Sequence, residues 1–212
     1  MDKGEINLVH GLWNRSWSLA FLAHRMRKTG FRVRMFDYPT TSADLSAHAS
    51  ELLRFVNASA AATVHLMGHS LGGLVILKML AERPELPPGR VMLLGTPLQG
   101  SLTVHNMLKL PGSNLLFGRV ASDLRHGHSH VAPGWEIGMI AGSRPFGLGR
   151  LAGRPGPASD GTVALSETMA PGLAARLVLP VSHTGMLFSA RVAREAGHFL
   201  ESGQFTPGFG SA

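Results

Sequence analysis

The sequence predicts an α/β fold with one mostly parallel, six-stranded sheet and helices on both faces. Short apolar runs alternate with longer stretches of helical periodicity, which is the pattern of successive βα units. The 212 residues are 44% hydrophobic and 16% charged. This length and composition suffice for one large domain with a substantial core, but not for two.

Six apolar runs have the length of β-strands, and in chain order they are 6–10, 31–36, 63–67, 91–94, 135–141 and 176–181. Four longer segments carry helical spacing, and they are 16–29, 43–56, 71–83 and 189–201. Ser16 is the expected N-cap of the first helix, Gly30 ends that helix, and Pro84 ends the third. Right-handed crossovers between parallel strands then place helices on both faces and a site above the carboxyl ends of the strands.

We expect residues 1–201 to form a single domain, with an irregular insertion at about 98–133 and a flexible tail at 202–212. The tail is rich in Gly, Ser and Pro and follows the last helix. The insertion is too long for a plain connection, which usually takes about 2–6 residues, and it is unusually apolar. One or two short helices that cover the site would explain it. An ordinary crossover helix with ragged ends fits its first half equally well.

The formal net charge is +7 and the pI is near 11.0, so the surface is basic. The arginines are scattered, and no nucleic-acid-binding motif accompanies them, so we expect no nucleic-acid partner. Peripheral contact with an anionic membrane surface remains open. The absence of cysteine excludes disulfides, a thiol nucleophile and a cysteine-ligated metal. A basic and apolar leader is not visible, nor is an apolar run of about 20 residues, so we expect a cytoplasmic protein without a membrane-spanning segment. The oligomeric state cannot be inferred.

The segment Gly68-His69-Ser70-Leu71-Gly72 closes a predicted strand and opens a predicted helix. A Gly-x-Ser-x-Gly in this context is typical of a nucleophile elbow, in which the serine adopts a strained backbone conformation. Glycines on either side let the strand and the helix approach closely. This arrangement predicts hydrolysis or transfer of acyl groups through Ser70. The alternative is a glycine-rich turn with an incidental serine.

A serine hydroxyl needs a neighbouring base, and the base needs a carboxylate that fixes its tautomer. In this topology the order along the chain is serine, acid, histidine. His183 follows the sixth predicted strand and is the expected base, whereas His198 falls inside the last helix. Asp160 follows the fifth predicted strand and a glycine-rich loop, and it is the expected acid. The alternative for Asp160 is a simple Asp-Gly turn. Asp123 comes too early and Glu167 too late.

The tetrahedral intermediate needs hydrogen-bond donors for its oxyanion. The backbone N–H of Leu71, directly after the nucleophile, is one expected donor, and the N–H of Leu12, in the loop after the first strand, is the other. Trp13 and His69 are the expected substrate-binding residues. Trp17 fits an acyl pocket and a core position equally well.

The alternating histidines of His126-Gly127-His128-Ser129-His130 raise the possibility of a metal site, since imidazole is a common zinc ligand. We interpret this segment as a solvated loop and predict no metal.

Five segments, taken together in this order, make the chain resemble the α/β-hydrolase superfamily and, within it, the bacterial lipases and esterases. They are Val9-His10-Gly11-Leu12, Gly68 to Gly73, Leu94-Gly95-Thr96-Pro97 with Gly100-Ser101, Ser159 to Val163, and Ser182-His183. The resemblance implies Ser70 as nucleophile, Asp160 and His183 as its partners, and no cofactor. The chain departs from the family in two ways: it has no room for the first two strands of the full fold, and Ala164 stands where many lipases have proline. The expected fold is therefore a minimal α/β-hydrolase.

The expected function is a serine carboxylic-ester hydrolase that acts on short- to medium-chain acyl esters, which are small molecules. The insertion is too short for a large interfacial lid, which favours an esterase over a lipase for longer acyl chains. The same catalytic residues also fit a thioesterase, a lactonase or an acyltransferase. A non-catalytic binding protein with the hydrolase fold is a further alternative.

Overall fold

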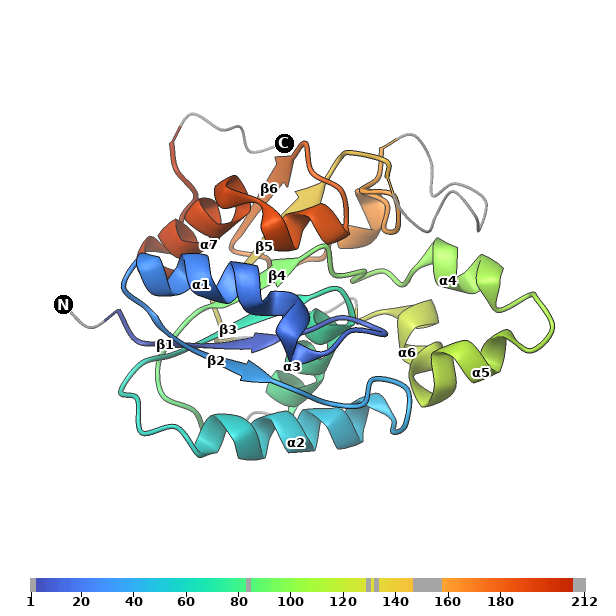
Figure 1. The fold of residues 1–212 in the computed structure, drawn as a ribbon, viewed down its shortest axis with the longest axis horizontal. Helices are drawn as coiled ribbons and strands as arrows, with labels where there is room; N and C mark the ends of the chain where they lie inside the picture. The colour runs from blue at the N-terminus through green and yellow to red at the C-terminus, as the bar shows by residue number, and fades with distance from the viewer. Residues whose placement is uncertain (1–2, 83–84, 129–130, 132–133, 147–157, 208–212) are drawn as a thin grey trace.

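The structure is a computed structural model that describes residues 3–82, 85–128, 131, 134–146 and 158–207. Its six strands form one sheet in the order β2-β1-β3-β4-β5-β6, and every neighbouring pair is parallel (Figure 1). The strands are β1 (Glu5–Val9), β2 (Arg32–Phe36), β3 (Val64–His69), β4 (Val91–Leu94), β5 (Ile137–Gly142) and β6 (Ala175–Leu179). The prediction of a mostly parallel, six-stranded sheet is confirmed.

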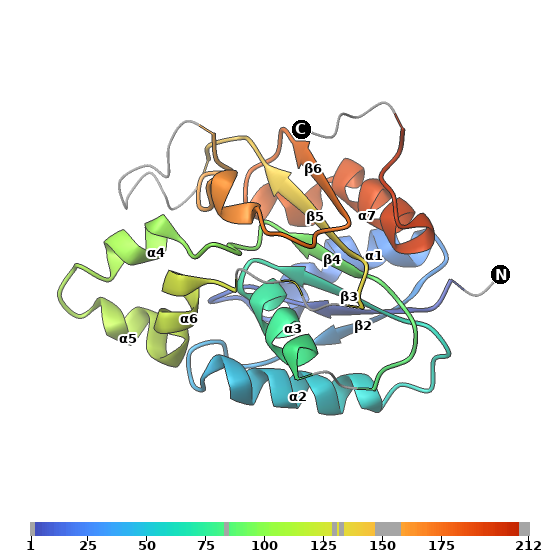
Figure 2. The same ribbon diagram turned by 180° about the vertical axis from the view of Figure 1, so that it is seen from behind.

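Helices cover both faces of the sheet, as predicted. The helices α1 (Ala20–Lys28) and α7 (Ala190–Ser202) lie on one face, and α2 (Leu45–Asn57) and α3 (Leu71–Ala81) lie on the other (Figures 1 and 2). Each face has its own hydrophobic cluster, and adjacent strand residues alternate between them: Leu8 packs toward α1 and α7, and Val9 toward α2 and α3. Because both faces are covered, a central strand such as β4 is buried at every residue and reads as a continuous apolar run.

The first helix does not begin as predicted. A short 3-10 helix, η1 (Ser16–Leu19), precedes α1, and Arg15, not Ser16, occupies the N-cap position. The backbone N–H of Ser16 donates to Asp37 Oδ1 at 2.7 Å. A carboxylate that follows β2 therefore takes the place of the side-chain cap, which a reading of the local sequence alone could not reveal.

The insertion forms more helices than the one or two predicted. They are α4 (Leu102–Met107), α5 (Ser113–Phe117), the 3-10 turn η2 (Gly118–Val120) and α6 (Ala121–His126), and they lie beyond the carboxyl ends of the strands (Figure 1). Glu167 and Thr162, in the segment after β5, tie α4 to the body of the protein. Glu167 Oε1 accepts from the Leu102 N–H at 2.6 Å, and Thr103 donates to the Thr162 carbonyl at 2.7 Å. We call residues 98–128 the cover.

The chain beyond α7 packs against this helix over its first residues, although the sequence predicts a flexible tail from 202 onward. Gly203 ends α7 in a left-handed conformation, and the Phe205 ring packs on Phe199 with centroids 5.4 Å apart. The N–H of Thr206 donates to buried Glu195. The rest of the predicted tail and the glycine-rich loop before Asp160 lie outside the described residues.

Candidate active site

Ser70 stands between β3 and α3 in a strained backbone conformation with a positive φ, at φ 53° and ψ −122°. The two following glycines make this tight turn possible. A Cβ at Gly72 would lie 2.3 Å from the Val9 carbonyl oxygen, and one at Gly73 would lie 2.0 Å from Thr96 Oγ1. Only residues without a Cβ fit there, so the start of α3 packs directly against β1 and the loop after β4. The local geometry is that of a nucleophile elbow.

Asp160 and His183 come together through their side chains. Asp160 lies in the segment after β5 and His183 directly precedes the 3-10 helix η5 (Thr184–Phe188), after β6. His183 Nδ1 is 2.7 Å from Asp160 Oδ2, and Asp160 is 1% exposed. The other carboxylate oxygen of Asp160 accepts from the N–H groups of Thr162 at 2.9 Å and Val163 at 2.7 Å. The carboxylate is thus held by its own turn and aimed at the imidazole.

Gly95, at the end of β4, packs against this pair. Its φ is +57°, and a Cβ there would lie 3.1 Å from both Asp160 Oδ2 and His183 Nδ1. The backbone of the strand next to the elbow therefore forms one wall of the space in which the two side chains meet. Any side chain at this position would be strained and would press on the Asp–His contact.

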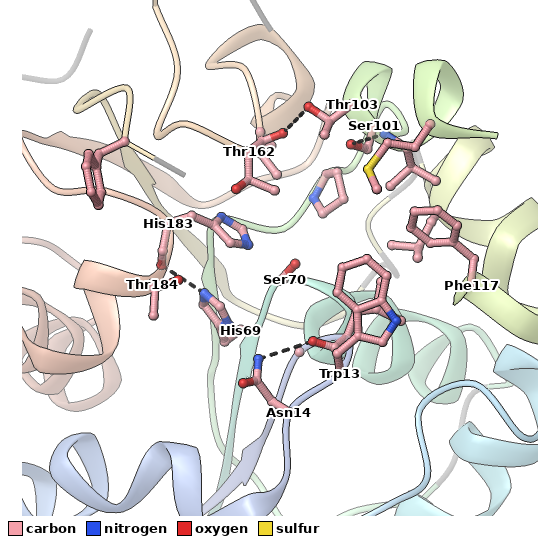
Figure 3. A pocket seen from close by; sticks show the side chains of 18 residues that line it. Trp13, Asn14, His69, Ser70, Ser101, Thr103, Phe117, Thr162, His183 and Thr184 are labelled. Carbon is pink, nitrogen blue, oxygen red and sulfur yellow. Dashed lines mark hydrogen bonds between the residues drawn. The ribbon is translucent and has the colours of Figure 1, made fainter. Parts of the chain in front are cut away.

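Ser70 and His183 line the same cavity, which has a volume of about 530 Å³. In Figure 3 the Ser70 hydroxyl and the His183 imidazole point into this shared space. In the described part of the chain, Ser70 Oγ makes no hydrogen bond, so the two side chains face one another without a formed contact. Catalytic hydrogen bonds often tighten only when substrate binds.

His69 lies beside His183 and is buried. Its Nε2 is 3.0 Å from the His183 carbonyl oxygen, and the two rings are 4.7 Å apart. The carbonyl can only accept, so Nε2 of His69 carries the proton. Burial, and secondarily the charge of His183, lowers the pKa of His69 to about 3. His69 is therefore a neutral neighbour that holds the backbone of His183.

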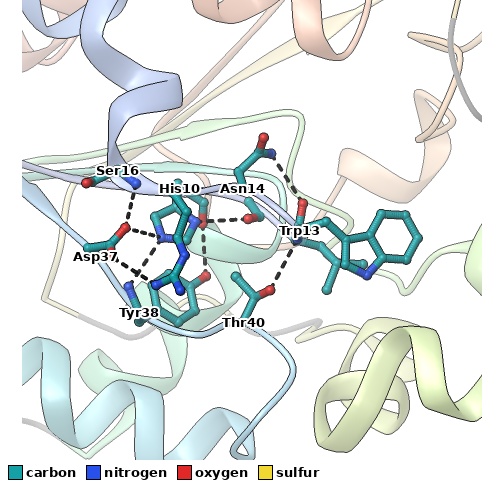
Figure 4. Close-up of polar contacts among 10 residues, drawn as sticks. His10, Trp13, Asn14, Ser16, Asp37, Tyr38 and Thr40 are labelled. Atoms are coloured by element: carbon teal, nitrogen blue, oxygen red, sulfur yellow. Dashed lines mark hydrogen bonds and ion pairs between the residues drawn. The ribbon is translucent and has the colours of Figure 1, made fainter.

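The loop after β1 approaches the elbow closely. A Cβ at Gly11 would lie 3.1 Å from Ser70 Cβ. Neither the Leu12 N–H nor the Leu71 N–H donates a hydrogen bond within the residues that the structure describes. Trp13, with φ 57°, follows Leu12, and Thr40 Oγ1 accepts its N–H at 3.2 Å (Figure 4). Two unused backbone donors thus flank Ser70.

The surface of the cavity is mostly apolar. Among its described lining residues there is no Lys, Arg, Asp or Glu, although the chain as a whole carries +7. The cover supplies Val104, Met107, Phe117 and Leu124, and Phe146 lies on the side of the acid loop. The four residues from the cover were not predicted individually as pocket residues, because its helices bring them over the site from positions 34 to 54 residues beyond Ser70 in the chain.

Trp13 and His69 both line the cavity, whereas Trp17 does not. Trp13 also contacts the cover: its indole N–H donates to the Leu116 carbonyl at 2.7 Å, and its ring lies 5.3 Å from that of Phe117. Trp17 is 74% exposed, so both expectations for it, pocket and core, are wrong. The short η1 turns its ring outward.

No group of three or more His, Asp or Glu side chains in the described residues could hold a metal ion. His126 lies in α6, where Nδ1 contacts the Ser122 carbonyl oxygen at 2.9 Å. His130 of the histidine-rich segment lies outside the described residues.

Residues 8–205 match the model of the alpha/beta hydrolase family, so the chain belongs to this family. A comparison with curated proteins finds no match. Among the described residues, no helix is long and apolar enough to cross a membrane.

Several solved structures share the fold. The mature form of the Bacillus licheniformis lipase BlEst2 is 17% identical with a TM-score of 0.68, over 92% of this chain and 90% of that one. The metagenomic carboxyl esterase MGS0156 is 15% identical with a TM-score of 0.66, over 84% and 64%. The phospholipase PlaB from Legionella pneumophila is 14% identical with a TM-score of 0.67, over 91% and 57%. At this identity the likeness concerns the fold alone.

Proposed function

We propose that the protein is a serine carboxylic-ester hydrolase in which Ser70 is the nucleophile, His183 the base and Asp160 the orienting acid. The observation that carries the proposal is the buried contact of 2.7 Å between Asp160 Oδ2 and His183 Nδ1. The imidazole of His183 faces the same cavity as Ser70, which stands in a strained elbow. A simple turn at Asp160 would not need a carboxylate that points at a histidine 23 residues further along the chain.

In the proposed reaction, His183 Nε2 takes the proton of Ser70 as Oγ attacks the ester carbonyl carbon. Asp160 accepts from Nδ1–H, which keeps Nε2 free to act as a base and stabilises the imidazolium. The N–H groups of Leu12 and Leu71 donate to the oxyanion of the tetrahedral intermediate. His183 then protonates the leaving alcohol, and an acyl-enzyme remains on Ser70. Water, deprotonated by His183, attacks this ester, and collapse of the second intermediate releases the carboxylic acid and restores Ser70.

His69 favours this cycle by remaining neutral. A second cation at 4.7 Å from the imidazolium would oppose its formation, and the pKa of about 3 excludes that charge at working pH. His69 and Trp13 are proposed to line the substrate site. The Nε2–H of His69 already donates to the His183 carbonyl oxygen, so it is not free to bind a substrate.

The substrate class follows from the cavity. A volume of about 530 Å³ with a mostly apolar lining suits a small neutral molecule, and a wall without Lys or Arg offers no counter-ion for a carboxylate or phosphate. We therefore propose neutral esters of short- to medium-chain acids. The same chemistry would serve a lipase, which takes longer acyl chains, and a thioesterase, a lactonase or an acyltransferase, which differ in the leaving group or the acceptor.

The test is hydrolysis of p-nitrophenyl esters from acetate to palmitate by the wild type, Ser70→Ala and Ser50→Ala. Ser50 is an exposed serine of α2 and is the matched control. We expect the wild type and Ser50→Ala to hydrolyse acetate and butyrate fastest, and Ser70→Ala to be inactive. A preference for palmitate or for emulsified triglyceride would point to a lipase. Faster turnover of thioesters or lactones, or product formed only with an alcohol acceptor, would reassign the reaction within the same mechanism. An inactive wild type would favour a binding protein.

A further inference from the structure

We propose that His10 is a positioning residue for the oxyanion hole, because it orients the peptide group that carries the Leu12 N–H. The inference rests on the proposed function, in which that N–H is an oxyanion donor. His10 directly follows β1 and is completely buried, and it has no part in the reaction steps described above.

The two ring nitrogens of His10 have different partners. Tyr38 donates its backbone N–H to Nε2 at 3.3 Å, so Nε2 carries no proton (Figure 4). Nδ1 therefore carries the proton, and it lies 3.0 Å from the Gly11 carbonyl oxygen, to which it donates. The hydrogen bond at one nitrogen thus fixes the tautomer that the other nitrogen needs.

The Gly11 carbonyl and the Leu12 N–H belong to the same peptide unit. This unit is planar and trans, so its C=O and N–H point in opposite directions. Holding the carbonyl oxygen of Gly11 therefore fixes the direction of the Leu12 N–H. The Asn14 N–H donates to the same oxygen at 3.3 Å. Hydrogen bonds accepted by the carbonyl also polarise the unit, which makes its N–H a stronger donor.

Tyr38 makes three contacts with His10. The two rings stack with centroids 4.4 Å apart, and the Tyr38 hydroxyl donates to the His10 carbonyl oxygen at 2.9 Å. The Tyr38 N–H supplies the third contact. Tyr38 follows β2, the strand that pairs with β1, so the body of the sheet determines where His10 lies.

The carboxylate nearest to the ring is already occupied. Asp37 Oδ1 is 3.5 Å from His10 Nε2, but Asp37 accepts from the Ser16 N–H at 2.7 Å and from Arg15 at 3.0 Å. Burial lowers the pKa of His10, so the neutral form persists. A proton on Nε2 would face the Tyr38 N–H, and the neutral ring avoids this repulsion.

Three substitutions separate the two hydrogen bonds from simple packing. His10→Asn places an amide N–H near the position of Nδ1, where it can donate to Gly11. His10→Gln places an acceptor near the position of Nε2, where it can serve Tyr38, but it loses the donor to Gly11. His10→Phe keeps only the ring on Tyr38. His48→Phe is the matched control, because this buried histidine packs on another side of Tyr38, with centroids 4.8 Å apart.

The experiment measures kcat and KM with p-nitrophenyl butyrate, the Ki of an alkyl trifluoromethyl ketone and the Tm of each variant. The ketone forms a hemiketal with the serine, so its Ki reports on the oxyanion hole without turnover. We expect kcat to fall about 10- to 100-fold in His10→Phe and His10→Gln, with a small change in KM. The upper end of this range approaches the loss in kcat that follows removal of one oxyanion donor. The Ki should rise in parallel. The kcat and Ki of His10→Asn should stay within severalfold of the wild-type values, and His48→Phe should keep the wild-type kcat and Ki.

Equal kcat and Ki for His10→Asn and His10→Gln would overturn the inference. It would also be overturned if the losses in kcat across the variants correlate with their Tm and not with the presence of a donor to the Gly11 carbonyl. The pair of His10→Asn and His10→Gln decides the matter even if His10→Phe does not fold. The wild type and Ser70→Ala are assayed beside them. If the wild type is inactive or Ser70→Ala remains active, the proposed function fails. If those two behave as proposed while His10→Gln retains full kcat, only the role of His10 fails.

Discussion

Asp160→Asn is the substitution whose consequence the structure specifies most completely. The wild-type carboxylate uses Oδ1 for the N–H groups of Thr162 and Val163, and Oδ2 for His183 Nδ1. In the variant, the amide oxygen can keep both turn bonds, which leaves the NH₂ group facing Nδ1. The loop should therefore stay in place, and the change in Tm should be small.

The chemical effect should be large. Facing an N–H donor, His183 Nδ1 must become the acceptor, and the ring proton moves to Nε2. Nε2 can then no longer take the proton of Ser70. A wrong tautomer of this kind lowers kcat by about 10⁴-fold, which corresponds to about 5.5 kcal/mol in the activation free energy. KM should change little, because Asp160 does not line the cavity.

The assay is kcat at saturating p-nitrophenyl butyrate, with Asp123→Asn as the matched control. Asp123 lies in α6, in the cover, and Asp123→Asn should retain nearly the full kcat. A near-normal Asp160→Asn enzyme would refute the reasoning. If Asp123→Asn were inactive at the same time, the acid would have to be assigned to the cover.

Gly95→Ala should fold, but the positive φ should lower its free energy of unfolding by about 1–2 kcal/mol. Its kcat should fall roughly tenfold or more, because the new Cβ presses on His183. Thermal unfolding and kcat measure the two effects, and an unchanged kcat would contradict the prediction. Val104→Trp should fill part of the cavity and lower the ratio of octanoate to acetate hydrolysis, whereas an unchanged ratio would show that the acyl chain lies elsewhere. Stability should also depend on pH, because burial lowers the pKa of four histidines, which are His10, His48, His65 and His69. The stability that these neutral rings contribute is present above about pH 6.5 and is lost as pH falls toward their folded pKa values, by up to about 1.4 kcal/mol per pH unit for each. Urea unfolding at pH 7.5 and 5.5 measures this loss, which should be smaller in His48→Phe; equal losses in the two proteins would contradict the account.

The sheet was predictable because its four central strands, β1, β3, β4 and β5, are buried at every residue and therefore appear in the sequence as apolar runs bounded by Gly. The elbow was predictable because its glycines are required by local packing, as the contacts of Gly72 and Gly73 show. Asp160 and His183 were found from chain order, and the structure brings them together, although their roles remain proposals.

The cover could not be predicted to the same degree. Its short helices are held by contacts distant in sequence, such as the bond from the Leu102 N–H to Glu167. The same holds for Ser16, whose N–H is satisfied by Asp37, directly after β2. The sequence places His10 at the end of the first strand and in the segment Val9-His10-Gly11-Leu12, but it gives the side chain of His10 no role of its own. Its link to the Leu12 peptide depends on Tyr38, 28 residues further along the chain.

The central claim is that Ser70 is a nucleophile activated by His183. The most direct test is the reaction with a fluorophosphonate, followed by intact-mass measurement and peptide mapping, for the wild type, Ser70→Ala and His183→Ala. The account predicts one adduct per chain, located on the peptide that contains Ser70. The adduct should be absent in Ser70→Ala and form far more slowly in His183→Ala. An adduct on another serine, or no adduct on a folded wild type that still hydrolyses esters, would contradict it.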